Sequence, residues 1–239
     1  MRYPDCPMVD ARAPAVAIHA AQLSRRHGGR WALRNLDLDV EAGTALMVFG
    51  PNGAGKTTLI RMLGTALAPT TGTLRLFGLP PGDQVRPRVA MVSHADHHYD
   101  DLSARENLRI LARLCPRDGD PDALLEEVGL GGRGDDIVRT FSAGMRKRLL
   151  FARMLWKKPD LVLLDEPYAG LDPAGARWVD KLVLDLRGRG ATVVMSTHQL
   201  ARGARLCTEA LMLRQGQAAW RGPASEAPDQ IEQIGRAHV

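Results

Sequence analysis

Residues 50–58 read GPNGAGKTT and lie between an apolar run, TALMVF at 44–49, and a helical pattern, TLIRML at 58–63. A strand, a glycine-rich turn and a helix in this order are the setting in which a GxxxxGK[ST] pattern wraps a phosphate. Glycine frees the backbone, and the helix N-terminus points N–H groups at the anion. We expect Lys56 to reach the outer phosphates and Thr57 to offer its hydroxyl to Mg²⁺. The predicted phosphate-binding residues are Gly50, Pro51, Asn52, Gly53, Ala54, Gly55, Lys56, Thr57 and Thr58.

A second motif, LVLLDEP at 161–167, has the pattern of a buried strand that ends in two acids. Its four apolar residues deliver Asp165 to the carboxyl end of the strand, where a carboxylate can hold the Mg²⁺ shell. Glu166 follows as a candidate base for the attacking water. Together the two motifs predict nucleotide hydrolysis or nucleotide switching.

The composition is that of an ordinary soluble globular protein of one or two domains, with 45% hydrophobic and 25% charged residues among 239. No apolar run approaches the length of a membrane span, and prolines and aspartates interrupt residues 4–10, so a signal peptide is not expected. Three distant cysteines argue against a disulfide framework and fit a reducing cytoplasm.

The formal net charge of +5 suits a nucleic-acid binder, a protein at an anionic membrane surface, or an arginine-rich chain without an electrostatic role. No basic run interleaved with aromatic residues occurs, so we expect no nucleic-acid partner.

Periodicity divides the chain into three parts. Alternating apolar residues predict strands at 16–20, 36–40 and 73–78. The middle reads as helices: one opens at a capping box of Ser103 and Glu106, one at Asp120 and one at Ser142. From Leu161 onward strands alternate with helices, and the polar stretch from residue 223 is expected to be a loosely held tail.

The stretch FSAGMRKRLLFAR at 141–153 resembles the signature motif of the ATP-binding subunits of ABC transporters. Ser142 and Gly144 match the motif, whereas Ala143 stands where a second glycine is usual and Met145 where glutamine is usual. The resemblance implies that these four residues meet the γ-phosphate of an ATP bound to a partner subunit.

The resemblance runs from about Val16 to Gly222 and implies the fold. We expect an α/β protein with a P-loop NTPase (RecA-like) core, an antiparallel β subdomain and an inserted α-helical subdomain, of the ABC ATPase type. The expected single domain spans 14–222, with its core at 14–93 and 158–222, the helical subdomain at 94–157 and a short tail at 223–239.

Further segments match in register and carry roles implied by the resemblance. AGLD at 169–172 is similar to the D-loop, in which Asp172 crosses the dimer interface, and STH at 196–198 places His198 as the residue that senses the γ-phosphate. RHGGRWAL at 26–33 is similar to the adenine-stacking loop, but His27 replaces the usual tyrosine and offers less stacking surface.

The stretch SHADHHYDD at 93–101 could be a metal site, since it gathers three histidines and three aspartates. The resemblance implies a different assignment, the Q-loop, in which His94 replaces the glutamine that contacts Mg²⁺ and the attacking water. His94, together with DEPYAGLD at 165–172, is similar to the ATP-binding subunit of the haem exporter of cytochrome c maturation.

The sequence therefore predicts an ATP-hydrolysing motor subunit that uses ATP and Mg²⁺ and belongs to an exporter. Its expected partners are a second copy or a homologous ATP-binding subunit and separate integral-membrane permease subunits, at the cytoplasmic face of the membrane. One alternative is a soluble ABC-type ATPase acting on ribosomes or DNA, although paired cassettes, long coiled coils and zinc modules are not evident. Another is a degenerate nucleotide sensor, because positions 27, 94, 143 and 145 depart from the family pattern.

Overall fold

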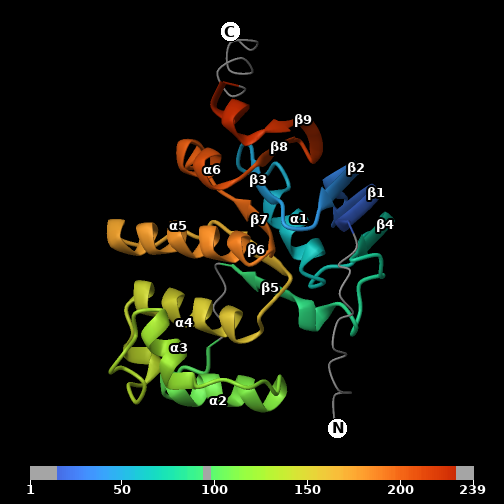
Figure 1. Cartoon of the computed structure of the whole chain (residues 1–239). Helices are drawn as coiled ribbons and strands as arrows, with labels where there is room; N and C mark the ends of the chain where they lie inside the picture. Colours follow the sequence, from blue (N-terminus) through green and yellow to red (C-terminus); the bar gives the residue numbers. More distant parts are fainter. Residues whose placement is uncertain (1–14, 94–97, 230–239) are drawn as a thin grey trace.

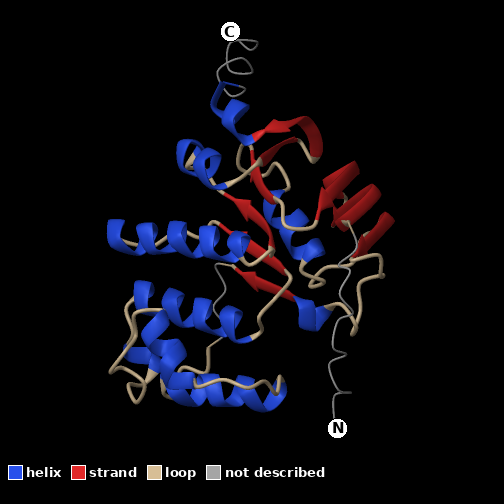
Figure 2. Cartoon of the chain, in the orientation of Figure 1, coloured by secondary structure: helices blue, strands red, loops and turns tan. Residues whose placement is uncertain are grey.

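The computed structural model describes residues 15–93 and 98–229 and is built around a six-stranded sheet (Figures 1 and 2). The strand order is β5-β6-β7-β3-β8-β9, and all neighbours run parallel except β9, which is antiparallel to β8. The strands are β3 (Ala45–Phe49), β5 (Val89–Val92), β6 (Leu161–Asp165), β7 (Thr192–Ser196), β8 (Glu209–Arg214) and β9 (Gln217–Pro223).

The central strands are apolar throughout because both faces of the sheet are covered. In β3, Ala45, Met47 and Phe49 enter one hydrophobic cluster, while Leu46 and Val48 enter another on the opposite face. Helices α5 (Pro173–Gly188) and α6 (Leu200–Leu206) lie on one side of the sheet, and α1 (Lys56–Leu63) lies on the other (Figure 1). This parallel, two-sided arrangement confirms the predicted P-loop core.

A three-stranded antiparallel sheet, ordered β2-β1-β4, packs beyond α1. Its strands are β1 (Val16–His27), β2 (Arg30–Glu41) and β4 (Thr71–Leu76). Alternate residues of these strands, among them Ile18, Leu38 and Leu76, are buried in the same cluster as α1. The alternation of apolar and polar residues in the sequence thus corresponds to a sheet with one apolar face. The predicted antiparallel β subdomain is confirmed.

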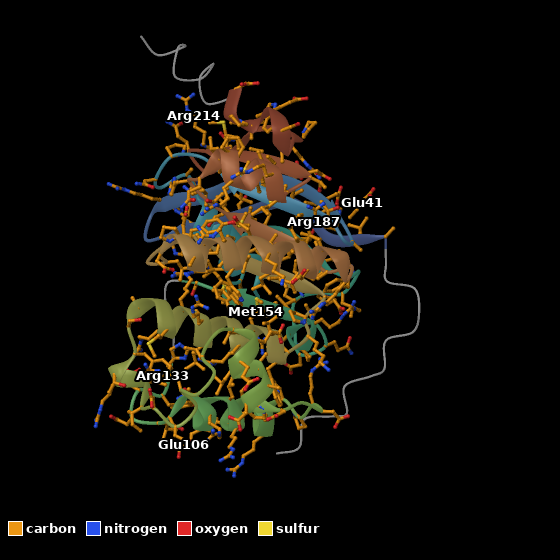
Figure 3. All side chains as sticks on the ribbon, turned by 60° about the vertical axis from the view of Figure 1, so that its left-hand side comes forward. Glu41, Glu106, Arg133, Met154, Arg187 and Arg214 are labelled. Atoms are coloured by element: carbon orange, nitrogen blue, oxygen red, sulfur yellow. The ribbon has the colours of Figure 1, made fainter. Side chains whose placement is uncertain are left out.

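The middle of the chain forms a helical layer of α2 (Ala104–Leu114), α3 (Pro121–Glu127) and α4 (Ala143–Trp156). The predicted capping box is present, since the Ser103 hydroxyl accepts from the Glu106 N–H and the Glu106 carboxylate accepts from the Ser103 N–H. In Figure 3 the labelled Glu106 and Arg133 lie at the lower, helical end and Met154 of α4 lies toward the sheet. Met154 is buried in the cluster that this layer shares with β5 and β6. The division of the chain at residues 94 and 157 stays a prediction.

The C-terminal part departs from expectation. Residues 217–223 form β9, which the sequence did not indicate, and a short 3₁₀ helix follows at Ala224–Glu226. Ala224 and Ala227 are fully buried in the core. The prediction of a loosely held tail is therefore wrong for Ala224 and Ala227, which pack on the core where the 3₁₀ helix contacts α6.

Two further 3₁₀ helices occur at Arg86–Arg88 and Val138–Thr140. Within residues 15–93 and 98–229, no helix has the length and apolar character needed to cross a bilayer.

Candidate nucleotide-binding and hydrolysis site

The sheet order brings three strand ends together. β7 lies between β3 and β6, so the loop after β3, the acids at the end of β6 and the residues after β7 meet at one edge. They line a cleft of about 390 Å³. The lining residues are Ala32, Asn52, Gly53, Ala54, Gly55, Lys56, Thr57, Thr58, Asp165, Glu166 and His198.

Two glycines hold the loop against neighbouring backbone. Gly50 has φ 136°, and a Cβ there would lie 2.0 Å from the carbonyl oxygen of Leu213 in β8. Gly55 has φ 106°, and a Cβ there would lie 2.4 Å from the carbonyl oxygen of Ala32 in β2. Only glycine meets both demands, so the loop is pinned by two other strands and presents a rigid cradle.

The helix that follows the loop carries no capping side chain. α1 begins at Lys56, and its N-cap residue Gly55 makes no side-chain hydrogen bond to the first turn. The first N–H groups of the helix thus point into the cleft without a competing carboxylate or hydroxyl, which is the arrangement of an anion-binding helix N-terminus.

Lys56 supplies a buried positive charge beside this cradle. Its side chain is nearly enclosed, and its Nζ donates to the carbonyl oxygens of Gly50 at 2.8 Å and Pro51 at 3.0 Å. Burial lowers the pKa of the ammonium below its ordinary value, and the charges of Glu166 and Asp165 oppose that shift. The ammonium is therefore close to both the loop and the acids.

Asp165 is almost fully buried, with 2% of its surface exposed. Its Oδ1 accepts hydrogen bonds from the Ser196 hydroxyl at 2.6 Å and the Thr57 hydroxyl at 3.2 Å. Two oxygen atoms that can ligate a metal, one from Thr57 of α1 and one from Asp165 of β6, thus lie together beside the phosphate loop. Oxygen is the ligand atom that Mg²⁺ prefers. The donor set fits a magnesium ion held by Thr57 and Asp165.

Glu166 is held in an unusual backbone conformation. Its φ is 49°, in the left-handed region that non-glycine residues rarely adopt. Its N–H donates to Ser196, 3.0 Å from the hydroxyl and 3.2 Å from the carbonyl oxygen. This hydrogen-bonded turn directs the carboxylate into the cleft.

The carboxylate of Glu166 lies beside His198. Its Oε1 is 3.1 Å from His198 Nε2, which is within ion-pair distance, but this buried oxygen accepts no aligned hydrogen bond from any residue that the structure describes. Since Glu166 lines the cleft, its carboxylate is placed to take a proton from a water bound there.

The structure adds two residues that sequence analysis passed over. The Ser196 hydroxyl donates to the Asp165 carboxylate and accepts from the Glu166 N–H. Lys147 of α4 places its Nζ 3.5 Å from the carbonyl oxygen of Glu166. Lys147 is only 8% exposed, and burial lowers its pKa while Asp165 and Glu166 oppose that shift. The helical period offered a signal, since Lys147 lies four residues before the fully buried Phe151.

Several predicted site residues do not line this cleft. Ser142 accepts from the Met145 N–H and caps α4, and Asp172 accepts from the Gly175 N–H and caps α5. A Cβ on Gly144 would lie 4.0 Å from the carbonyl oxygen of Gly170, so the start of α4 lies beside the segment 169–172. Ala143 and Met145 belong to the same first turn and are likewise away from the lining.

His27 ends β1, where it pairs with Arg30 across the hairpin, and it is exposed. It is not among the residues that line the cleft. His94 lies outside the described residues. Among those described, no group of three or more His, Cys, Asp or Glu side chains is placed to hold a metal ion. The roles expected for His27, His94, Asp172 and the four signature residues stay predictions.

Comparison with known proteins adds a family to this geometry. The family model described as "ABC transporter" matches residues 33–169, which is more than half of the chain. The chain belongs to the ABC transporter family. It is an ATPase with the ABC cassette fold, and ATP is its nucleotide.

Family members of known role resemble the chain over most of its length. It is 38% identical to the Nod factor export ATP-binding protein I of Cupriavidus metallidurans over 85% of this chain and 70% of that protein. It is 36% identical to the daunorubicin/doxorubicin resistance ATP-binding protein DrrA of Streptomyces peucetius over 89% of this chain and 67% of that protein.

A solved ATP-binding subunit of an ABC transporter superposes with a TM-score of 0.81 at 25% identity, over 90% of this chain and 93% of that one. A dimeric ATP-binding cassette bound to ADP and Pi gives a TM-score of 0.79 at 21% identity, over 87% of this chain and 98% of that one. The second likeness shows the fold alone, and it is the fold predicted from the sequence.

Proposed function

We propose that this chain is the ATP-hydrolysing motor of an ABC exporter, working as one half of a dimer on separate permease subunits at the cytoplasmic face of the membrane. One observation carries the proposal: Lys56, Thr57, Asp165, Glu166 and His198 converge on a single cleft at the carboxyl ends of β3, β6 and β7. This intact set also argues against the degenerate nucleotide sensor.

The residues divide the work of hydrolysis. The loop backbone and Lys56 bind the phosphates, and Thr57 and Asp165 would hold Mg²⁺, which when bound neutralises phosphate charge. Glu166, whose side chain lines the cleft, accepts the proton of the attacking water. His198, whose Nε2 lies 3.1 Å from Glu166 Oε1, lines the same cleft and is placed to meet the terminal phosphate.

The signature residues act on the neighbouring subunit in this proposal. Ser142, Ala143, Gly144 and Met145 lie away from the chain's own cleft, at the start of a helix whose N-terminus suits a phosphate. Asp172 lies in the adjacent segment and would cross the same interface. A second copy of the chain supplies the complementary cleft.

For the cargo we propose an organic small molecule carried outward. This follows the printed roles of the two relatives, Nod factor export and daunorubicin/doxorubicin resistance. Haem is a second, more specific hypothesis. It rests on His94 and on the stretch DEPYAGLD at 165–172, and it is tested directly with the assembled transporter. In that test the two cargo classes are compared by how strongly each stimulates ATP turnover.

The motor itself is tested with the purified full chain. Wild type should hydrolyse ATP only with Mg²⁺, and Glu166→Gln should still bind Mg·ATP but turn over at least about a hundredfold more slowly, because it lacks the base. Lys56→Ala should lose nucleotide binding. Equal turnover by wild type and Glu166→Gln would remove Glu166 from its role and the hydrolysis mechanism with it.

The transporter assignment is tested separately, by purifying the tagged chain from native membranes together with its permease. ATP turnover that rises in liposomes with the permease and an organic cargo would support it. A chain that fractionates with ribosomes or DNA instead would favour the soluble alternative.

A further inference from the structure

A cluster behind the cleft ties together the two segments that carry Glu166 and His198. Tyr168 follows Glu166 by two residues, Asp180 belongs to α5, and Arg202 lies in the first turn of α6. We refer to these three side chains as the Tyr168 cluster. None of them lines the nucleotide cleft.

Both oxygens of Asp180 are used within the cluster. The Tyr168 hydroxyl donates to Oδ1 at 2.9 Å, and Arg202 Nε lies 3.3 Å from Oδ2. The guanidinium of Arg202 also covers the Tyr168 ring, with its Cζ 4.9 Å from the ring centroid. The three side chains are thus mutually in contact, so displacing one of them breaks its contacts with the other two.

The Tyr168 ring is almost fully buried, 5% exposed, and it is held by polar contacts on one side. Burial, reinforced by Asp180, raises the pKa of its hydroxyl well above the ordinary value, so the hydroxyl stays protonated and donates. A phenylalanine would fill the same space, so the hydroxyl is there for its bond to Asp180.

At one end the cluster fixes the turn after Glu166. The Ala169 N–H donates to the carbonyl oxygen of Glu166, and the Leu171 N–H donates to that of Tyr168, both at 3.2 Å. Because Tyr168 lies inside this turn, anchoring its side chain anchors the left-handed backbone of Glu166.

At the other end the cluster fixes the residues after His198. Arg202 donates to the Gln199 side-chain oxygen at 3.0 Å, and the Gln199 N–H donates to the Thr197 hydroxyl at 3.0 Å. His198 lies between these two anchored neighbours. The cluster therefore connects the segment that carries Glu166 to the segment that carries His198, and these two side chains lie 3.1 Å apart in the cleft.

We propose that Tyr168, Asp180 and Arg202 are positioning residues that hold Glu166 and His198 in register for ATP hydrolysis. The inference rests on the proposed function, because it takes Glu166 and His198 as the hydrolytic pair. It assigns the cluster a large effect on turnover and a small one on nucleotide binding, since the phosphate loop and Lys56 are built by other elements and only His198 links the cluster to the phosphates.

The chain contains a matched control. Arg88 also pairs with an aspartate, Asp160, at 2.7 Å and covers an aromatic ring, Phe77, at 3.8 Å. The Arg88 side chain is 16% exposed and that of Arg202 is 23% exposed. Arg88 and Asp160 precede β5 and β6, at the end of the sheet opposite the cleft.

The experiment compares wild type, Tyr168→Phe, Arg202→Leu, the double variant of these two, Arg88→Leu and Glu166→Gln. For each purified full chain, kcat and KM for Mg·ATP, the affinity for a fluorescent ATP analogue and the midpoint of denaturation are measured. Arg202→Leu should lower kcat roughly tenfold and Tyr168→Phe roughly threefold, because a small misplacement of catalytic groups costs turnover steeply. KM and analogue affinity should stay within about twofold.

Two comparisons separate positioning from stability. Arg88→Leu should lower the denaturation midpoint about as much as Arg202→Leu while its kcat stays within about twofold of wild type. The double variant should be no slower than Arg202→Leu alone, because residues that act as one unit are not additive.

The inference is overturned if Arg202→Leu and Tyr168→Phe keep kcat within about twofold of Arg88→Leu, or if analogue affinity falls in step with kcat. Should Arg202→Leu fail to fold, Tyr168→Phe decides alone, since it removes one oxygen. Failure of the proposed function looks different: wild type and Glu166→Gln would then turn over equally, whatever the cluster variants do.

Discussion

The strongest single test of the site's geometry is Ser196→Ala. Ser196 is fully buried at the end of β7, and its hydroxyl donates to Asp165 Oδ1 at 2.6 Å while accepting from the Glu166 N–H at 3.0 Å. The substitution removes one oxygen and leaves the backbone and neighbouring side chains unchanged. It therefore tests the one hydroxyl that contacts both the Asp165 carboxylate and the Glu166 N–H.

The magnitude follows from the partners. The Glu166 N–H keeps the Ser196 carbonyl oxygen as an acceptor at 3.2 Å, so its loss is small. The buried Asp165 carboxylate loses a short hydrogen bond, and among the described side chains the Thr57 hydroxyl at 3.2 Å remains as its one donor. A hydrogen bond to a charged group contributes about 1.5–3 kcal/mol, so we expect unfolding free energy to fall by about 2 kcal/mol and Tm by about 4–8 °C.

Ser24→Ala is the matched control. Ser24 is also buried, and its hydroxyl donates to the carbonyl oxygen of Gln22 at 3.1 Å and accepts from the Asn35 N–H at 2.9 Å. These bonds are neutral, so the loss should be about 1 kcal/mol, half of that at Ser196. Ser24 lies in the antiparallel sheet, away from the cleft, and its substitution should leave kcat unchanged.

The assays are urea denaturation without nucleotide and steady-state ATP hydrolysis across a range of Mg²⁺ concentrations. Ser196→Ala should require more Mg²⁺ for half-maximal turnover and lower kcat about tenfold, which corresponds to about 1.4 kcal/mol of the lost bond expressed in the transition state. If Ser196→Ala were no less stable than Ser24→Ala and hydrolysed ATP at the wild-type rate, the geometric account of the acidic pair would be refuted.

Three other outcomes are expected. Lys147→Met should lower kcat about tenfold with KM unchanged, because the cation beside the carbonyl oxygen of Glu166 is lost. Lys147→Arg restores a cation there and should recover part of the lost kcat. Equal kcat values for Lys147→Met and wild type would contradict this role. Mixing inactive Ser142→Arg and Lys56→Ala chains should restore about a quarter of wild-type activity, since half of the dimers then hold one intact shared site; no recovery on mixing would exclude that site. Burial raises the pKa of Cys207 to about 12, so at pH 8.5 iodoacetamide should modify it at least about a hundredfold more slowly than an ordinary thiol, measured by mass spectrometry; modification as fast as at Cys115 would contradict the burial.

The parts of the site that the sequence predicted are those in which chemistry and local pattern coincide. The phosphate loop needs glycines at fixed spacing between a strand and a helix, and the close approaches at Gly50 and Gly55 show why. The acidic pair follows four apolar residues because a fully buried strand must end before a carboxylate can face a cleft. Each of the two motifs, at 50–58 and at 161–167, is no longer than nine consecutive residues, so neither required knowledge of tertiary contacts.

The residues that were missed depend on contacts between distant segments. Lys147 and Ser196 each reach the acids from another element, and a buried polar side chain inside an apolar pattern looks like any exposed one until its partner is known. β9 was missed for a related reason. None of the residues of its sequence, QAAWRGP, is fully buried, because among the described strands β9 is an edge strand that pairs with β8 alone, and Trp220 anchors it by packing on Phe49.

These contacts indicate which helix can alter the surroundings of Glu166. Glu166 is bonded by Ser196 of β7, approached by Lys147 of α4, and anchored through Tyr168 to α6. Of these three, α4 belongs to the helical layer, and its N-cap is Ser142, the residue proposed to meet the partner's nucleotide. Lys147 lies about one turn into that helix, so a shift of α4 by a fraction of its pitch would move the ammonium away from the Glu166 peptide. In the proposed dimer, engagement of the signature by a partner would therefore act on the Glu166 peptide through the buried Lys147 side chain, while the contacts from β7 and α6 stay in place.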